Sequence, residues 1–307
     1  MREGVYHIPV LLKESVDTLN IDPNGVYVDV TFGGGGHSRE ILTRLDQGRL
    51  FAFDQDPDAH DNAIDDPRFT LISANFRFIG RFLRLYGIKQ VDGILADLGV
   101  SSHQFDAGER GFSIRFDAHL DMRMSQNGRL TAKIIVNEWE ASELTRVFKL
   151  YGELQNARRI AKTIEEVRQE TPIETTLDLI RATSKLAPTH KPLKFQAQLF
   201  QALRIAVNAE MEALEEMLDQ TATLLKTGGR LSVITYHSLE DRMVKYYMRS
   251  GKKDGEVEKD FFGRHITPFK PLIKGTTPSE EETSKNPRAR SAKLRVAERI
   301  NEQTKRA

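Results

Sequence analysis

The sequence predicts an α/β fold in which a mainly parallel sheet is interrupted by a helical insertion. Three observations indicate this: short apolar runs alternate with amphipathic segments at the start, a central stretch has helical periodicity alone, and the alternation then resumes. Alternation of this kind is typical of βαβ units, whose strands are buried on both faces. We place the insertion at residues 105–195, between the sheet-domain segments 1–104 and 196–307.

Short apolar runs in the first segment predict buried parallel strands, because each run ends in glycine or polar residues. The predicted strands are Val26–Phe32, Arg49–Phe53, Phe69–Ile72 and Val91–Ala96, with a helix at His37–Leu45. Residues 105–130 have no clean period, whereas Ala141–Leu186 has a helical pattern. Within that stretch, Thr171–Glu174 contains a cap residue, a first-turn proline and a capping-box glutamate, which together predict the start of a helix.

The α/β pattern resumes after the insertion. Apolar residues at steps of three or four predict one long amphipathic helix from Leu199 to Leu225, ended by Thr227-Gly228-Gly229. A fifth strand is expected at Arg230–Thr235, and a capping box at Ser238–Asp241 opens a helix to about Arg249. The polar segment 251–287 has a possible strand near His265–Ile273, and Leu294–Ile300 fits a strand or a short helix.

The composition limits the classes of function. With a net charge of +1, the chain does not bind nucleic acid by bulk charge alone, although a local basic surface is compatible with that value. It has no cysteine, which excludes disulfides, thiolate metal sites and cysteine nucleophiles. The sequence has no signal-peptide pattern and no apolar run of about 18 residues, so we expect a cytoplasmic protein without a membrane span.

The stretch from Asp29 to Ser38 joins a predicted strand to a predicted helix through four consecutive glycines. Glycines at such a junction allow a ligand to approach the backbone and the first N–H groups of the helix. A tight turn without a ligand is the alternative, but four glycines cost more conformational entropy than a turn requires. The sequence therefore predicts a nucleotide-type cofactor at this loop.

The residues around the loop favour S-adenosylmethionine over a dinucleotide. The NAD fingerprint has glycine or alanine where this chain has Ser38, and the P-loop lysine is absent. Asp29 would repel a pyrophosphate but not a cationic sulfonium. Asp54 ends the next strand, where a carboxylate can accept from ribose hydroxyls. We expect Asp56 to be exposed in the following turn, and we expect no metal at Asp54 and Asp56 because two carboxylates alone are weak ligands.

Asp97 follows the fourth strand, together with Ser101 and Ser102, and the carboxyl ends of parallel strands face the ligand crevice. Carboxylate, carbonyl and hydroxyl oxygens there could hold the hydrogens of an exocyclic amine and orient its nitrogen. Turn capping is the alternative for these three residues. Methylation at carbon 5 of a pyrimidine usually requires a cysteine nucleophile, so the missing cysteines leave nitrogen or oxygen as the acceptor atom.

Two residues that end the fifth strand and two basic clusters complete the candidate site. Tyr236 could stack on a base, and His237 is either catalytic or an ordinary hydrogen-bonded residue near a helix cap. Cations are dense at 287–295 and after the fifth strand, which makes an RNA-facing surface credible. The candidate RNA-binding residues are Tyr236, Arg242, Lys245, Arg288 and Arg290.

The motifs taken together resemble the bacterial MraW/RsmH family, the 16S ribosomal RNA cytosine-N4 methyltransferases. The matching stretches are His7–Leu12, Gly33–Ser38, Asp97–Ser102, Arg110–Ser113, Leu120–Met124, Phe200–Ile205, His237–Arg242 and Asn286–Ser291. They cover nearly the whole chain in the right order. Departures occur at His103 and His119, where the family usually has proline, and at Lys194–Gln198 and Tyr151–Gln155.

The resemblance implies a class I, Rossmann-like, S-adenosylmethionine-dependent methyltransferase fold with a helical domain inserted after the fourth strand. It implies methylation of the N4 amine of a decoding-centre cytidine on the small ribosomal subunit, and it is compatible with a homodimer. By motif position, the cofactor contacts it implies are Gly35, Gly36, His37, Asp54, Phe76, Asp97 and Gln104. Three alternatives stay open: a methyltransferase acting on another RNA, DNA or protein amine, a Rossmann-type dehydrogenase, and a non-catalytic RNA-binding factor.

Overall fold

A computed structural model describes residues 9–101, 105, 108–263 and 265–301. The chain forms two compact units, one from Met1–Gly99 with Met211–Ala307 and the other from Val100–Glu210. Each unit has a hydrophobic core of its own. The helical unit is therefore wider at both ends than the predicted insertion at 105–195.

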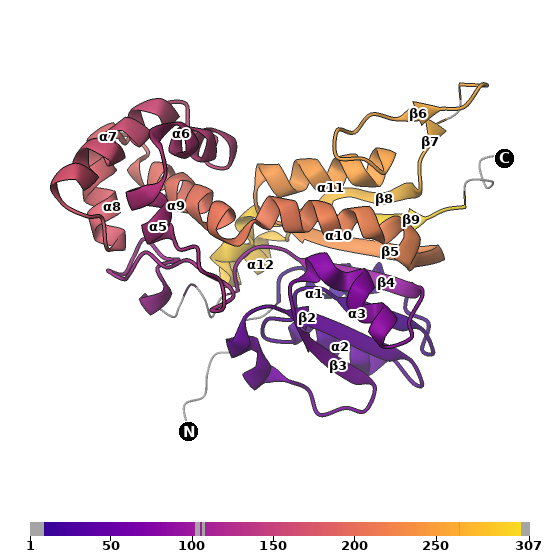
Figure 1. Ribbon diagram of the computed structural model, residues 1–307. Coiled ribbons are helices and arrows are strands. Elements are labelled where there is room, and N and C mark those ends of the chain that lie inside the picture. Colours follow the sequence, from indigo (N-terminus) through magenta and orange to yellow (C-terminus); the bar gives the residue numbers. More distant parts are fainter. Residues whose placement is uncertain (1–8, 102–104, 106–107, 264, 302–307) are drawn as a thin grey trace. The chain divides into compact units, whose positions relative to one another are not determined.

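The first unit is built on a seven-stranded sheet with the order β3-β2-β1-β4-β5-β9-β8 (Figure 1). Its strands are β1 (Val26–Asp29), β2 (Arg49–Asp54), β3 (Phe69–Ser73), β4 (Val91–Asp97), β5 (Leu225–Thr235), β8 (Phe269–Thr276) and β9 (Lys293–Arg299). The first five are parallel, whereas β9 is antiparallel to both β5 and β8. This order, with its reversed strand beside β5, is that of the class I methyltransferase sheet, so the predicted fold class is confirmed.

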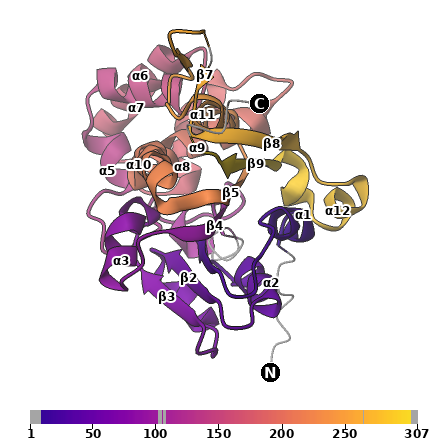
Figure 2. The same ribbon diagram turned by 90° about the vertical axis from the view of Figure 1, so that its right-hand side faces the viewer.

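Helices cover both faces of this sheet, as Figure 2 shows for α3 and α10 on one face and α1 and α2 on the other. The helices of the unit are α1 (Leu12–Asp17), α2 (Gly36–Arg44), α3 (Ile79–Leu85), α10 (Glu210–Leu224), α11 (Ser238–Ser250) and α12 (Glu280–Lys285). On the α3 and α10 face, Ile79, Leu83 and Met217 pack against sheet residues such as Val28 and Ile94. Burial on both faces explains why the parallel strands are continuous apolar runs.

The second unit contains α5 (Ala132–Glu138), α6 (Ala141–Leu150), α7 (Ala157–Glu170), α8 (Thr176–Thr183) and α9 (Pro192–Asn208). The helix start expected at Thr171 is wrong, because α7 continues to Glu170 and the next helix is capped by Thr175. The intervening residues are held outside any helix: Asn137 exchanges two hydrogen bonds with the backbone of Ile173. A long-range contact therefore overrides the local capping signal.

The single long helix expected from Leu199 to Leu225 is also wrong. The chain forms two helices, α9 and α10, separated by Ala209 in the left-handed conformation with φ 48° and ψ 46°. The apolar pattern continues past Ala209, because both helices bury apolar side chains at steps of three or four residues. The break leaves α9 in the core of the helical unit and α10 on the sheet.

Near the C-terminus the structure settles what the pattern left open. The segment expected at Leu294–Ile300 to be a strand or a short helix forms strand β9, which runs from Lys293 to Arg299. Strand β5 begins at Leu225, five residues before the predicted start. The polar segment 251–287 contains β8, the short helix α12 and a small hairpin of β6 (Glu258–Lys259) and β7 (His265–Ile266). Within the described part of the chain, no helix has both the length and the apolar character needed to cross a membrane.

Candidate active site

The glycine loop lies between β1 and α2, at the carboxyl edge of the parallel strands. One side of the loop is tightly packed: a Cβ on Gly35 would lie 2.8 Å from the Phe32 ring, and one on Gly36 would lie 2.1 Å from Pro9. On Gly33 and Gly34, a Cβ would meet no atom of a described residue within 4 Å. The loop is thus anchored on one side and open on the other, which fits a ligand resting against its backbone.

Asp29 stabilises this loop from the protein core through hydrogen bonds. It is fully buried, and its carboxylate accepts hydrogen bonds from the Ser38 hydroxyl (2.7 Å) and the Thr31 N–H (3.1 Å). Burial raises the pKa of Asp29, and the bonds from Ser38 and Thr31 oppose that rise. The Thr31 hydroxyl in turn accepts the N–H of Asp97 at 2.6 Å, so it connects the loop to the end of β4.

Asp54 ends β2 and holds the opposite side of the loop. One carboxylate oxygen accepts the Gly33 N–H and the other accepts the Asp56 N–H, both at 2.8 Å. Burial raises the pKa of Asp54 to about 6. Each carboxylate oxygen can accept a further hydrogen bond, so the side chain can still bind a ligand hydroxyl.

Asp56 is not exposed as expected; only 4% of it is accessible. Its side chain accepts the Asp58 N–H and caps the short 3-10 helix η1 (Pro57–Asn62), which explains the burial. Phe76 begins a second 3-10 helix, η2 (Phe76–Phe78), after β3 and packs, half-buried, against the sheet core. The residues predicted to bind the cofactor therefore lie at or after the ends of three neighbouring strands. Gly35 and Gly36 follow β1, Asp54 ends β2, and Phe76 follows β3.

His37 and Asp97 face each other at the heart of the site. The His37 Nε2 lies 3.2 Å from the Val10 carbonyl, and since a carbonyl only accepts, the ring proton is on Nε2. Burial lowers the pKa of His37, although nearby Asp97 opposes this, so the ring is uncharged at neutral pH. Its Nδ1 lone pair lies 3.9 Å from Asp97 Oδ2, which makes the contact a pair of acceptors rather than an ion pair.

Asp97 is also hydrogen-bonded on its other oxygen. The Tyr236 hydroxyl donates to Oδ1 at 2.7 Å, and 23% of the Asp97 side chain is exposed. Burial raises the pKa of Asp97 to about 6, while the hydrogen bond from the Tyr236 hydroxyl counteracts that rise. The Tyr236 ring lies against Gly99, where a Cβ would be 3.4 Å from it. Tyr236 thus contacts Asp97 directly, and its stacking on a base stays a prediction.

His237 has the structural role that the sequence left as an alternative. It is the N-cap of α11, so the capping box lies one residue earlier than predicted, between His237 and Glu240. Its Nδ1 accepts the Glu240 N–H at 3.4 Å, while Nε2 lies 3.1 Å from Glu240 Oε1 without hydrogen-bond alignment to any described residue. A catalytic role for His237 stays a prediction.

The two serines and Gln104 are not placed at this site by the described residues. Ser101 belongs to the helical unit, where its carbonyl accepts the Phe105 N–H at 3.3 Å. Ser102 and Gln104 lie outside the described residues, as does His103. Their suggested roles in holding an amine and the cofactor therefore stay predictions.

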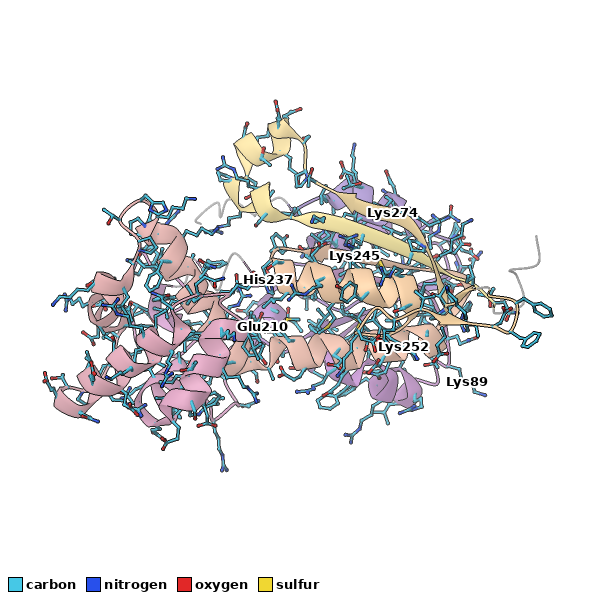
Figure 3. The ribbon with its side chains drawn as sticks, turned by 90° about the horizontal axis from the view of Figure 1, so that it is seen from above. Lys89, Glu210, His237, Lys245, Lys252 and Lys274 are labelled. Atoms are coloured by element: carbon cyan, nitrogen blue, oxygen red, sulfur yellow. The ribbon has the colours of Figure 1, made fainter. Side chains whose placement is uncertain are left out.

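The cations of the predicted basic surface differ in their exposure. Arg242 and Lys245 are exposed on α11, where Figure 3 labels Lys245, and Arg288 and Arg290 are exposed near α12. By contrast, Lys293 and Arg295 in the same basic stretch both bind Asp241, with Arg295 Nε at 2.7 Å and Lys293 at 3.1 Å. The exposed residues are those that a phosphate backbone can reach.

Sequence reasoning missed three contributors to the site. Thr31 connects Asp29 to Asp97, Val10 fixes the His37 tautomer, and Glu240 accepts the N–H groups of Tyr236 and His237. Thr31 could have been found, because it lies two residues after Asp29 and therefore points to the same side of an extended chain. The contacts of Val10 and Glu240 with the site depend on the tertiary fold and have no local signature.

The sheet order and the glycine loop define a class I methyltransferase. The chain belongs to the MraW methylase family, whose model matches residues 4–300. It is 60% identical over 296 residues to the ribosomal RNA small subunit methyltransferase H of Flavobacterium johnsoniae, which covers 96% of this chain and 98% of that protein. The Flavobacterium psychrophilum protein of the same name is 60% identical over 290 residues, covering 94% and 100%. The resemblance inferred from the motifs is confirmed.

Proposed function

We propose that this chain transfers a methyl group from S-adenosylmethionine to the N4 amine of a decoding-centre cytidine in 16S rRNA. The observation that carries the proposal is the acceptor pair of His37 Nδ1 and Asp97 Oδ2, 3.9 Å apart beside the open glycine loop. Membership of the MraW methylase family supports it, as do relatives named for the small ribosomal subunit RNA. We expect the protein to act in the cytoplasm. That it forms a homodimer also stays a prediction.

The residues present fit S-adenosylmethionine. The backbone of Gly33 and Gly34 is open to a ligand. The Asp54 carboxylate can accept further hydrogen bonds from ribose hydroxyls. The ring of half-buried Phe76 can pack on adenine. The donor supplies, when bound, a methyl group on a cationic sulfur that an amine nitrogen can attack. The acidic surroundings of Asp29 and Asp97 suit a cation better than a pyrophosphate.

The acceptor pair performs the positioning that an aromatic amine requires. Such an amine is a poor nucleophile because its lone pair is delocalised into the ring, and it has two hydrogens to donate. His37 Nδ1 and Asp97 Oδ2 can each accept one of them, which fixes the nitrogen and its direction of approach. At neutral pH Asp97 is ionised, since its pKa is about 6, and can act as this acceptor.

The exposed cations supply the second requirement, which is binding of a large polyanion. Arg242, Lys245, Arg288 and Arg290 are accessible to phosphates, which bind mainly by charge. The acceptor pair recognises an amine rather than a particular base. A methyltransferase of the same fold that acts on another amine is therefore the second candidate.

Two substitutions separate cofactor binding from turnover. Asp54→Ala should weaken S-adenosylmethionine binding by roughly 10- to 100-fold in calorimetry, because a charged acceptor is lost. Asp97→Ala should lower turnover on unmethylated small subunits by about 100-fold or more. Asp61→Ala, which removes an exposed carboxylate from the same turn as Asp56, is the matched control and should change neither quantity. Near-normal turnover by Asp97→Ala would rule out its role.

A further inference from the structure

The β6–β7 hairpin projects from the sheet unit beyond the end of α11, as Figures 1 and 2 both show. Helix α11 begins beside the Asp97 site and its 13 residues span about 20 Å. The hairpin follows its C-terminal end, where Gly251 caps the helix with φ 75°. The tip is therefore remote from the acceptor pair, and a ligand held there is not the target base.

The tip is a well-formed turn with two phenylalanines at its corner. The Gly263 N–H donates to the Asp260 carbonyl at 2.9 Å, and the Phe262 N–H donates to the Asp260 carboxylate at 2.8 Å. Gly263 has φ 75°, a value that suits glycine. These bonds fix Phe261 and Phe262 at the outer corner of the turn.

Both phenylalanine side chains point into solvent. Phe261 is 98% exposed and Phe262 is 74% exposed, and their rings are in edge-to-face contact with centroids 5.6 Å apart. Turn corners are normally polar or glycine, because an exposed aromatic gains nothing in folding. Adjacent exposed aromatics on a fixed turn therefore indicate a binding surface.

The base of the hairpin is anchored to the rest of the sheet unit. The Pro268 carbonyl accepts from the Ile300 N–H at 3.0 Å and from Arg299 at 3.2 Å, and Lys252 forms an ion pair with Glu258. A Cβ on Gly251 would lie 2.6 Å from Pro268, so the two arms of the segment are in close contact. The tip is thus presented on a supported stem, which lowers the entropy cost of binding.

Cations that form no ion pair with any described residue lie at the stem and on the elements beside it. Lys259 on β6 and Lys270, next to Phe269 at the start of β8, belong to the stem. Lys245, in the middle of α11, and Lys274, near the other end of β8, lie farther from the tip (Figure 3 labels both). Free cations next to solvent-facing aromatic rings are the combination with which proteins bind single-stranded nucleic acid: charge holds the phosphates and rings stack on bases.

We propose that Phe261 and Phe262 form a second RNA contact, in which an unpaired base stacks on the tip while Lys259 and Lys270 hold the adjoining phosphates. This deepens the proposed function, since it assumes an RNA substrate. A second copy of this chain is a poorer occupant, because two phenylalanines bury at most about 500 Å², less than the roughly 800 Å² per partner of a standard protein interface. The tip adds affinity for RNA and takes no part in methyl transfer.

The test measures binding of a fluorescein-labelled single-stranded RNA of about 20 nucleotides, and of unmethylated small subunits, without S-adenosylmethionine. The Phe261→Ala/Phe262→Ala variant should bind both roughly tenfold or more weakly. It should bind S-adenosylmethionine normally, and its kcat on subunits should be unchanged while KM rises. Leu85→Ala, which removes a 73% exposed apolar side chain from α3, is the matched control and should leave RNA binding unchanged.

Two further variants identify the kind of contact. Phe261→Tyr/Phe262→Tyr keeps the aromatic faces and should bind RNA normally, whereas Phe261→Leu/Phe262→Leu keeps apolar area alone and should bind as weakly as the alanine variant. Recovery by leucine, or a loss confined to subunits with naked RNA unaffected, would assign the tip to a protein partner and overturn the proposal. Normal RNA binding by the alanine variant would also overturn it. Failure of the wild type to methylate subunits would instead contradict the proposed function, because the binding measurements do not require turnover.

Discussion

Asp97 can serve as an amine acceptor because three neighbouring residues position it. Thr31 holds its N–H, the Tyr236 hydroxyl donates to Oδ1, and neutral His37 leaves a second acceptor beside Oδ2. Burial, together with negative charge from Asp29 and Glu240, raises the pKa of Asp97 to about 6, whereas the hydrogen bond from Tyr236 opposes that rise. The pKa of Asp97 thus lies only a little below neutral pH, and the hydrogen bond from Tyr236 helps to keep the carboxylate ionised.

The variant Tyr236→Phe tests this balance through the pH dependence of the reaction. Loss of the donated hydrogen bond disfavours the carboxylate, so the pKa of Asp97 should rise above about 6. Activity requires the ionised form, and it is lost as pH falls through that pKa. The acid limb of kcat/KM, measured from about pH 5.5 to about 8.5, should therefore move to higher pH.

The control for this experiment is Tyr246→Phe on α11, whose ring lies under Arg249 rather than beside Asp97. Its pH profile should match that of the wild type. If the Tyr236→Phe profile also matched, with activity changed by the same factor at every pH, Tyr236 would be structural rather than a positioning residue for Asp97.

At the scale of elements, the basic stretch 287–295 combines two roles that its sequence does not separate. Arg288 and Arg290 are exposed on the 3-10 helix η5 (Pro287–Ser291), whereas Lys293 and Arg295 on β9 bind Asp241 of α11. Only 7% of Arg295 is exposed, and a second bond to the Lys274 carbonyl fixes its guanidinium. The strand residues therefore join β9 to α11, whereas the helix residues are exposed and stay the predicted contacts to RNA.

This division predicts opposite results for two sets of variants. Arg288→Ala/Arg290→Ala should weaken RNA binding severalfold and change the free energy of unfolding by less than about 0.5 kcal/mol. Arg295→Ala should lower that free energy by about 3 kcal/mol, because half-buried Asp241 keeps its charge without its main partner. Urea unfolding and RNA-binding titrations measure the two effects. Equal destabilisation by both sets would show that the exposed arginines are structural as well.

The pattern of the sequence predicts elements well where burial is periodic and poorly where a distant contact decides. The five parallel strands follow from apolar runs, but nothing in the sequence marks Ala209 as the left-handed residue that separates α9 from α10. Two of the departures from the family pattern, Lys194–Gln198 and Tyr151–Gln155, contact each other in the helical unit, because the Gln198 amide donates to the Gly152 carbonyl at 2.9 Å. Such a pairing is visible only once the chain has folded.

At the scale of the whole molecule, the site is assembled from segments that are far apart in the sequence. The glycine loop, Asp54 and Asp97 could be predicted, because strand ends in a parallel sheet meet at one edge. The contacts from Val10 and Tyr236 could not, since they depend on how α1 and the end of β5 pack around that edge. Chemistry was thus predictable from residue types and strand order, whereas the hydrogen bonds that tune it required the structure.

Transfer of a methyl group to the N4 amine of one cytidine can be established from the identity of the product nucleoside. Unmethylated small subunits and naked 16S rRNA are incubated with the protein and isotopically labelled S-adenosylmethionine, and the digested RNA is analysed by mass spectrometry. We expect label in N4-methylated cytidine at a single position, and about 100-fold less label or none with Asp97→Ala. Label on a carbon atom, on another base, or equal labelling by Asp97→Ala would contradict it.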